Sequence, residues 1–133
     1  MSNNNKGEFR FAYFSDIYEE TLNFYKNKLE FNLDFSWDRS KNDKGSLFSF
    51  GSGLIEILQL PDNESEFNLG LDHRSPTGSF MVIETQDIET QFSKYKDKGI
   101  SFKQEITIQS WGHKSFSILD PNGVLLYFFE NHV

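Results

Sequence analysis

The sequence of 133 residues contains no cysteine. A disulfide framework, a thiolate metal site and a cysteine nucleophile are therefore all excluded. Long apolar runs are missing as well, since no stretch approaches the length of a membrane span and residues 1–7 lack the apolar core of a signal peptide. These absences predict a cytoplasmic protein that makes no use of a membrane.

Positive charge is scarce too. The 13 Lys and Arg residues against 20 Asp and Glu residues give a formal net charge of −7. Nucleic-acid binding needs clustered Lys and Arg to neutralise phosphates, so no nucleic-acid partner is expected. An acidic chain attracts cationic partners at long range, although this acidity can equally serve solubility alone.

Aromatic residues are abundant by contrast. They make up 17% of the chain, with 15 Phe, and this is about twice the share in an ordinary globular protein. The length suits about one domain with a real core. Two readings follow, in which these rings either line a cavity or simply fill the core.

The stretch WGHKSFSILDPNGVLLYFFE, residues 111–130, predicts a hairpin. Its centre, Asp120 to Gly123, has the sequence of a β-turn. Polar and apolar residues alternate before the turn, whereas residues 124–129 are almost continuously apolar. The second strand is therefore expected to be central in its sheet and covered on both faces.

The rest of the chain reads as one order of elements that occurs twice. The first set is a strand over 8–14, a helix of about three turns capped by Asp16, a strand over 31–37, a charged turn over 39–45 and strands over 47–50 and 54–60. The second set is a strand over 79–85, a helix from Asp87 to Lys98-Gly99, a strand over 100–106 and the hairpin.

A shift of 71 positions superimposes the two sets, placing Phe9 on Phe80 and Glu56 on Tyr127. The fold class predicted is α+β, with two tandem βαβββ modules whose helix-free, concave sheet faces form a groove. The predicted organisation is a disordered tail over 1–7 and one domain over 8–133, with module one at about 8–60, a linker at 61–78 and module two at about 79–130.

Two stretches, FSDIYEETLNFYKNKLEF and the hairpin, resemble signatures of the vicinal-oxygen-chelate superfamily. That superfamily contains glyoxalase I, bleomycin-resistance proteins, fosfomycin-resistance transferases and extradiol dioxygenases. The resemblance runs from about Phe9 to Glu130 and implies the glyoxalase/bleomycin resistance/dioxygenase fold.

The resemblance also implies four matched points for metal ligands, which here are Phe9, Glu56, Phe80 and Tyr127. Only Glu56 supplies an anionic oxygen, and one carboxylate does not hold a divalent ion against water. We therefore expect no metal and no other cofactor, and no metal-dependent glyoxalase or dioxygenase chemistry. A different metal site using His73 or His113 would lack ligand spacing among the three histidines.

Strand alternation predicts which side chains share the concave faces. Those predicted to point into the concavity are Phe9, Phe11, Tyr13, Glu56, Leu58, Phe80, Val82, Glu84, Leu125, Tyr127 and Phe129, with Trp37, Trp111 and His113 at the rim. Such an aromatic groove with two carboxylates predicts a planar or cationic small molecule as ligand. The ligand-binding residues predicted are Phe9, Phe11, Trp37, Glu56, Phe80, Glu84, Trp111, His113, Tyr127 and Phe129.

Plainer roles stay open for some of these residues. Glu56 could pair with Arg10 or a Lys, Glu84 could be a surface charge, and the two Trp residues could pack in an interface. An aromatic face and open sheet edges favour a homodimer.

Two functions are compatible with the pattern. The first is a non-catalytic protein of the bleomycin-resistance type that binds and sequesters a small molecule, antibiotics included. The alternative is a glyoxalase-like lyase or isomerase, in which Glu56 or Glu84 is the general base and Tyr127 the proton donor.

Overall fold

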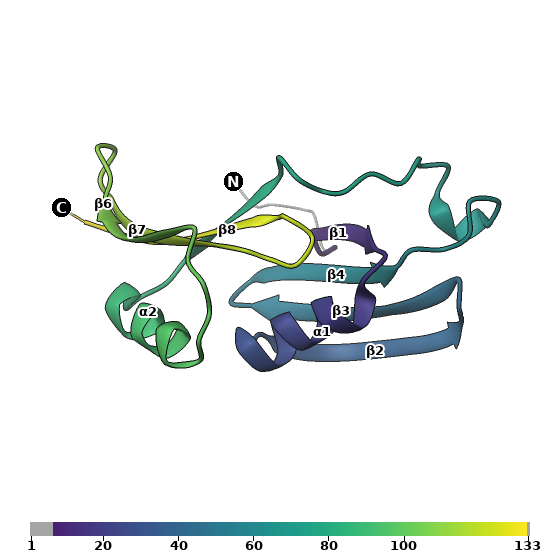
Figure 1. Ribbon diagram of the computed structural model, residues 1–133, viewed down its shortest axis with the longest axis horizontal. Coiled ribbons are helices and arrows are strands. Elements are labelled where there is room, and N and C mark those ends of the chain that lie inside the picture. Colours follow the sequence, from purple (N-terminus) through teal and green to yellow (C-terminus); the bar gives the residue numbers. More distant parts are fainter. Residues whose placement is uncertain (1–6, 133) are drawn as a thin grey trace. The chain divides into compact units, whose positions relative to one another are not determined.

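The computed structural model describes residues 7–132, so the tail predicted over 1–7 lies, apart from Gly7, outside the described residues. The chain divides into two compact units, of which the first ends at His73 and the second begins at Arg74 and also includes Asn27–Leu29. Each unit holds a four-stranded sheet and a helix, which confirms the predicted α+β pair of βαβββ modules (Figure 1).

In the first unit the strand order is β1-β4-β3-β2, with β1 parallel to β4 and the other pairs antiparallel. Its elements are β1 (Arg10–Ser15), α1 (Tyr18–Asn23), the π-helical turn η1 (Phe24–Lys28), β2 (Asn32–Ser40), β3 (Asp43–Phe50), β4 (Gly53–Gln59) and the 3-10 helix η2 (Glu66–Asn68). The charged turn predicted over 39–45 is shorter in the structure, because it consists of residues 41–42 while the flanking residues belong to β2 and β3. Arg39 pairs with Asp43 at 3.2 Å, and the side chains of Asp43 and Lys44 are only 19% and 27% exposed, so these charges do not interrupt the strands.

The first helix begins one residue later than predicted. Ile17, not Asp16, is the N-cap, and no side chain caps the helix. Instead the hydroxyl of Ser15 accepts a hydrogen bond from the Ile17 N–H at 3.1 Å and lies 3.2 Å from the hydroxyl of Thr21. Because η1 continues α1, the predicted length of about three turns is confirmed.

The second unit repeats the order as β5-β8-β7-β6, with β5 parallel to β8. Its elements are β5 (Phe80–Glu84), α2 (Ile88–Asp97), β6 (Gln104–Ile108), β7 (His113–Leu119) and β8 (Leu125–Asn131). Asp87 caps α2 by accepting a hydrogen bond from the Thr90 N–H at 3.1 Å, as predicted. Within residues 7–132, no helix is long and apolar enough to cross a membrane.

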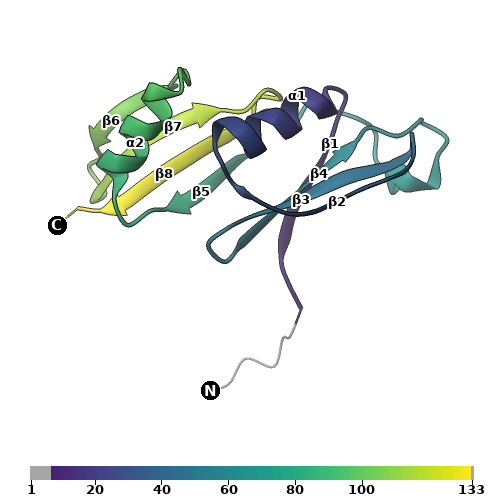
Figure 2. The same ribbon diagram turned by 90° about the horizontal axis from the view of Figure 1, so that it is seen from below.

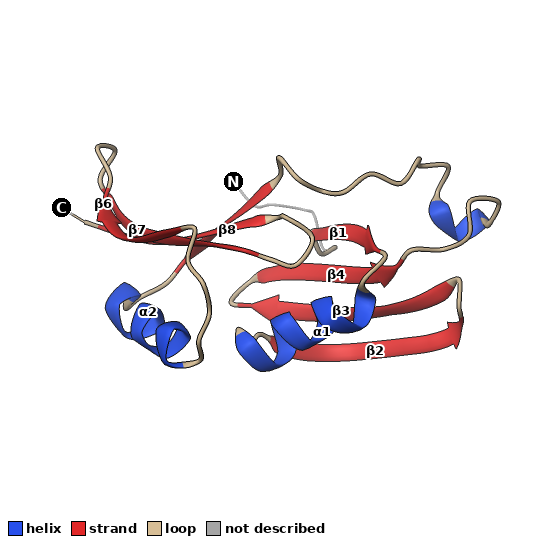
Figure 3. Ribbon diagram, viewed as in Figure 1, coloured by secondary structure: helices blue, strands red, loops and turns tan. Residues whose placement is uncertain are grey.

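Each helix lies against one face of its own sheet, and the core of each unit fills that interface (Figure 3). In the first unit the rings of Tyr25 and Phe48 are 5.9 Å apart, and both side chains are buried. In the second unit Phe116 and Phe128 stack at 4.9 Å beneath Tyr95 of α2. Burial of such rings supplies most of the favourable free energy of folding.

The central position of β8 between β5 and β7 is confirmed, but its expected cover on both faces is wrong. Leu126 and Phe128 are buried, whereas Leu125, Tyr127 and Phe129 on the other face are only half-buried. Residues 124–129 are apolar on both faces of the strand because the face away from the core is an aromatic surface. No helix of the second unit covers that surface (Figure 2).

Candidate functional site

The open face of each sheet, meaning the face away from its helix, is the candidate site. In β1 the register differs from the prediction. Ala12 pairs with Glu56 and Val82 pairs with Tyr127, so the two first strands are related by 70 positions whereas Glu56 and Tyr127 are related by 71. A slip of one residue moves every side chain of a strand to the opposite face.

The prediction that Phe9, Phe11 and Tyr13 lie on the open face is therefore wrong for β1. Phe11 and Tyr13 pair with Ile55 and Ile57 on the helix-covered face, and Tyr13 is buried. Phe9 precedes the strand and is 88% exposed. The position equivalent to Phe80 is Arg10, which shares the open face with Glu56.

An ion pair occupies this part of the first sheet. The Nη1 atom of Arg10 donates to Oε1 of Glu56 at 2.7 Å, while Nε and Nη2 donate to Oε1 of Glu8 at 3.0 and 2.6 Å. The hydrogen bond to Glu56, and then that to Glu8, holds the pKa of Arg10 above its ordinary value. Of the roles left open for Glu56, pairing with Arg10 is the one observed.

Trp37 lies on the same open face, against the backbone of β3. It pairs with Gly45, and a Cβ atom at residue 45 would come within 2.4 Å of the Trp37 ring. The ring of Phe35, which is about half exposed, is 5.5 Å away. A glycine is required here because the indole takes the space of a side chain. The sequence contained this glycine, but nothing in its pattern tied it to Trp37.

The second sheet keeps the predicted register. Phe80 pairs with Leu125, Val82 with Tyr127 and Glu84 with Phe129, all on the open face. Phe80 is 61% exposed and Val82 is 57% exposed. The open face of the second unit thus carries large apolar side chains in contact with solvent.

Four residues from β7, β8 and the preceding turn form a cluster on this face, which we call the aromatic platform: Trp111, His113, Tyr127 and Phe129. The His113 ring stacks on Phe129 at a centroid distance of 4.0 Å and an interplanar angle of 17°. The indole N–H of Trp111 lies 3.1 Å from both His113 Nδ1 and the Tyr127 hydroxyl, which are 3.0 Å apart. Because an indole N–H only donates, the arrangement is satisfied with the neutral imidazole protonated at Nε2.

Glu84 adds a negative charge at the edge of the platform. Its backbone pairs with Phe129, and its side chain is exposed. Within residues 7–132 its carboxylate forms no ion pair or hydrogen bond. It differs in this from Glu56, whose charge is matched by Arg10.

The positions that the resemblance implies for metal ligands, once realigned to the observed register of β1, do not fit a metal ion. In the first unit they carry Arg10 and Glu56, a cation paired with a carboxylate, and in the second they carry Phe80 and Tyr127. A guanidinium repels a metal cation and a phenyl ring donates no lone pair. Across residues 7–132, no group of three or more His, Asp or Glu residues is placed to hold a metal ion, His73 and His113 included.

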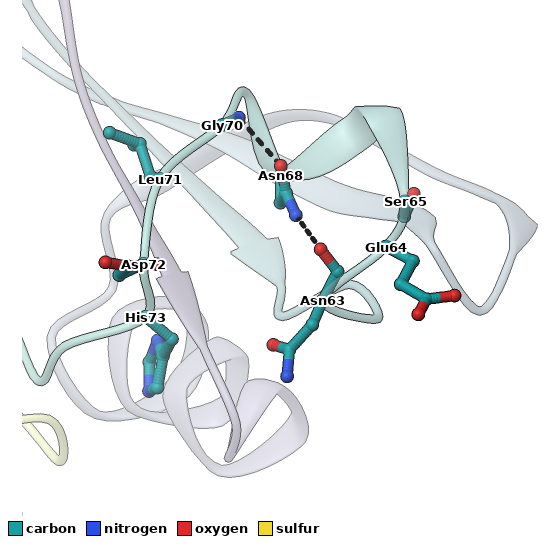
Figure 4. Close-up of a pocket in the computed structure, with 8 residues that line it drawn as sticks. All are labelled: Asn63, Glu64, Ser65, Asn68, Gly70, Leu71, Asp72 and His73. Atoms are coloured by element: carbon teal, nitrogen blue, oxygen red, sulfur yellow. Dashed lines mark hydrogen bonds between the residues drawn. The ribbon is translucent and has the colours of Figure 1, made fainter.

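A separate hollow of about 570 Å³ lies in the segment predicted to be a linker (Figure 4). The side chain of Asn68 closes this loop by donating to the Asn63 carbonyl at 2.5 Å and accepting from the Gly70 N–H at 2.7 Å. The hollow contains none of the aromatic residues predicted to bind a ligand. Its lining residues are Asn63, Glu64, Ser65, Asn68, Gly70, Leu71, Asp72 and His73.

Comparison with known proteins gives a consistent set of matches. A model of the Glyoxalase/Bleomycin resistance protein/Dioxygenase superfamily matches residues 9–128. No curated protein sequence matches the chain.

Solved structures share the fold at low sequence identity. TioX from Micromonospora sp. ML1 has a TM-score of 0.74 at 12% identity, over 94% of this chain and 98% of that one. TnmS3, an antibiotic binding protein from Streptomyces sp. CB03234, has a TM-score of 0.72 at 11% identity, over 98% and 99%. A lactoylglutathione lyase from Agrobacterium tumefaciens has a TM-score of 0.72 at 12% identity, over 95% and 94%.

Proposed function

The chain belongs to the Glyoxalase/Bleomycin resistance protein/Dioxygenase superfamily, and within it we propose a non-catalytic protein that binds and sequesters a planar, positively charged small molecule, without a metal centre. The observation that carries the proposal is the aromatic platform beside Glu84. Fold similarity to TnmS3, whose described role is antibiotic binding, is consistent with an antibiotic as ligand.

The platform suits a flat guest. Trp111 is 62% exposed, and His113 and Phe129 present parallel rings on the same side of the sheet. Aromatic faces attract planar and cationic groups, and stacking on rings fixed by hydrogen bonds costs little conformational entropy. The hydrogen bonds of Trp111 to His113 and Tyr127 pre-organise the indole for such a contact.

The charge expected of the ligand follows from Glu84. A ligand that covers the platform removes water from this carboxylate, and a desolvated carboxylate without a partner is costly. A cationic group on the ligand removes that cost. In the first unit Arg10 already meets this need for Glu56.

The test is a fluorescence titration of the Trp37→Phe variant, in which Trp111 is the sole tryptophan. Bleomycin and the planar cation proflavine are expected to quench its emission. Replacing Glu84 by Gln should weaken binding of the cations by about 1–3 kcal/mol, or about five- to 150-fold. Glu105→Gln removes the same charge from exposed β6 and should leave binding unchanged.

Two results would contradict the proposal. One is equal affinity of the Glu84→Gln variant for proflavine. The other is tighter binding of a planar anion, such as anilinonaphthalene sulfonate, than of proflavine at the same site.

The enzymatic alternative, a glyoxalase-like lyase or isomerase, draws support from the fold shared with the lactoylglutathione lyase. Against it, one oxygen of Glu56 already accepts a hydrogen bond from Arg10. In the second unit the residue paired with Tyr127 on the open face is Val82, whose apolar side chain cannot serve as a general base. Turnover of the methylglyoxal–glutathione adduct, lost in Glu56→Gln or Glu84→Gln, would favour the enzyme. A cytoplasmic location and a homodimer remain part of the proposal.

A further inference from the structure

We propose that Arg10 forms an anion-binding site on the open face of the first unit, which takes the carboxylate of a small molecule, and that Glu8 fills this site when no such molecule is bound. The site is independent of the binding proposed for the aromatic platform. It uses residues 8, 10 and 56, which lie in the other unit of the chain.

Glu56 fixes the orientation of the guanidinium. Its carboxylate projects from the middle of β4, is only 19% exposed, and accepts from Nη1 of Arg10 at 2.7 Å. Arg10 lies opposite Leu54 in the register, and Ala12 lies opposite Glu56. The methyl group of Ala12 is too short to cover the ion pair, and the Arg10 side chain remains 35% exposed.

The edge of the guanidinium that Glu56 does not contact is formed by Nε and Nη2, which together match the two oxygens of a carboxylate. In the structure both nitrogens donate to a single oxygen, Oε1 of Glu8, at 3.0 and 2.6 Å. A carboxylate from outside could place one oxygen on each nitrogen. Glu8 therefore stands where the carboxylate of a ligand would lie.

The carboxylate of Glu8 can readily leave Arg10. It precedes β1, and its side chain is 56% exposed, so its contact with Arg10 is a surface ion pair. Such pairs contribute little to stability because water and salt replace them readily. Glu56 is held more firmly, because its side chain is only 19% exposed and projects from an internal strand of the sheet. The two carboxylates thus have different roles, one positioning Arg10 and the other competing with the ligand.

The experiment compares 2-naphthoate with 2-naphthamide, which has the same shape without the charge. Binding to the full chain is followed by the ¹H–¹⁵N signal of Arg10 Nε, and dissociation constants are taken from the titration. Naphthoate is expected to shift this signal and to bind at least about fivefold more tightly than naphthamide. In Glu8→Gln the affinity for naphthoate should rise by about threefold or more, because its competitor is gone, with no change for naphthamide.

Arg10→Gln should abolish the preference for naphthoate. Arg39→Gln, which removes the same charge from another ion pair of the first unit, should preserve it. The proposal is overturned if naphthoate and naphthamide bind wild type alike, if the Arg10 Nε signal does not move, or if Arg10→Gln keeps the preference. Proflavine binding to the aromatic platform is a separate measurement, so failure of one proposal does not decide the other.

Discussion

The contact between Trp37 and Gly45 makes the most direct prediction about the open face of the first unit. In Gly45→Ala the new Cβ would lie 2.4 Å from Cζ2 of the indole and 2.8 Å from Cη2. Carbon atoms pack at about 3.5–4.0 Å, so the overlap exceeds about 1 Å. The rigid ring cannot bend away from it. Either the strands separate or the ring rotates off the sheet.

The size of the effect is best measured against Gly53→Ala. Residue 53 begins β4, and its added Cβ would meet only the Phe50 carbonyl at 3.4 Å, an ordinary contact. Both variants lose a glycine, so the difference between them isolates the clash with Trp37. Overpacking of this kind costs about 1–3 kcal/mol of unfolding free energy, and we expect Gly45→Ala to be less stable than Gly53→Ala by that amount.

Urea unfolding followed by far-ultraviolet circular dichroism measures this difference in stability. Both variants are built on Trp111→Phe, so that fluorescence emission, recorded separately, reports Trp37 alone. A red shift of emission in Gly45→Ala would identify rotation of the ring into water. In the Gly45→Ala/Trp37→Leu double variant the extra cost should disappear, because the two changes share one contact. The reasoning is refuted if Gly45→Ala matches Gly53→Ala in stability and leaves the emission unchanged.

Four further measurements follow from the structure. Light scattering should return about twice the chain mass of 15.6 kDa, and a monomer at micromolar concentration would contradict the homodimer. Elemental analysis of untagged protein should find well under one transition-metal ion per chain, and chelator should leave the melting temperature unchanged, because no bound ion would be lost from the native state. The hydrogen bonds from Thr90 hold the pKa of Asp87 below its ordinary value of 3.8, so its stabilising effect is present above that pH and is lost as pH falls through the lower, folded-state value. Asp87→Asn should therefore flatten the dependence of melting temperature on pH in the acid range, and an unchanged acid profile would contradict this. Finally, a single cysteine introduced at Ala12 should react with a thiol reagent much faster than one at Tyr13, and the reverse order would restore the predicted register of β1.

The sequence was sufficient for the architecture because its signals were local. The Asp120–Gly123 turn, the cap at Asp87 and the left-handed Gly99 each depend on a few neighbouring residues, and all three occur as predicted or in the predicted place. The repetition of the pattern then strengthened the prediction of the fold. Two weak βαβββ patterns at one spacing identify a fold that neither pattern would identify alone.

The register of β1 escaped prediction because both of its faces look alike in sequence. Phe11, Tyr13 and Phe14 are all aromatic, so apolar periodicity does not say which face meets the helix. The assumption that Asp16 caps the helix as Asp87 does then set the alignment, and the structure puts Ile17 at that position instead. The informative signal was Arg10, because a long cation at the start of a strand belongs on the face that meets solvent.

That single residue changes what the first unit can bind. With Phe9 aligned to the ligand position, the open face would carry an aromatic ring next to an unpaired Glu56, and a cation would be the natural guest. With Arg10 there, Glu56 is already paired and needs no cationic ligand, and the N–H donors of Arg10 that contact Glu8 become available to an anion once Glu8 leaves. The two sheets share one topology, yet Glu84 in the second unit forms no ion pair within residues 7–132, whereas Glu56 in the first unit is neutralised by Arg10. Because Arg10 and Glu56 meet across 46 positions of sequence, this difference depends on a contact that no local pattern could contain.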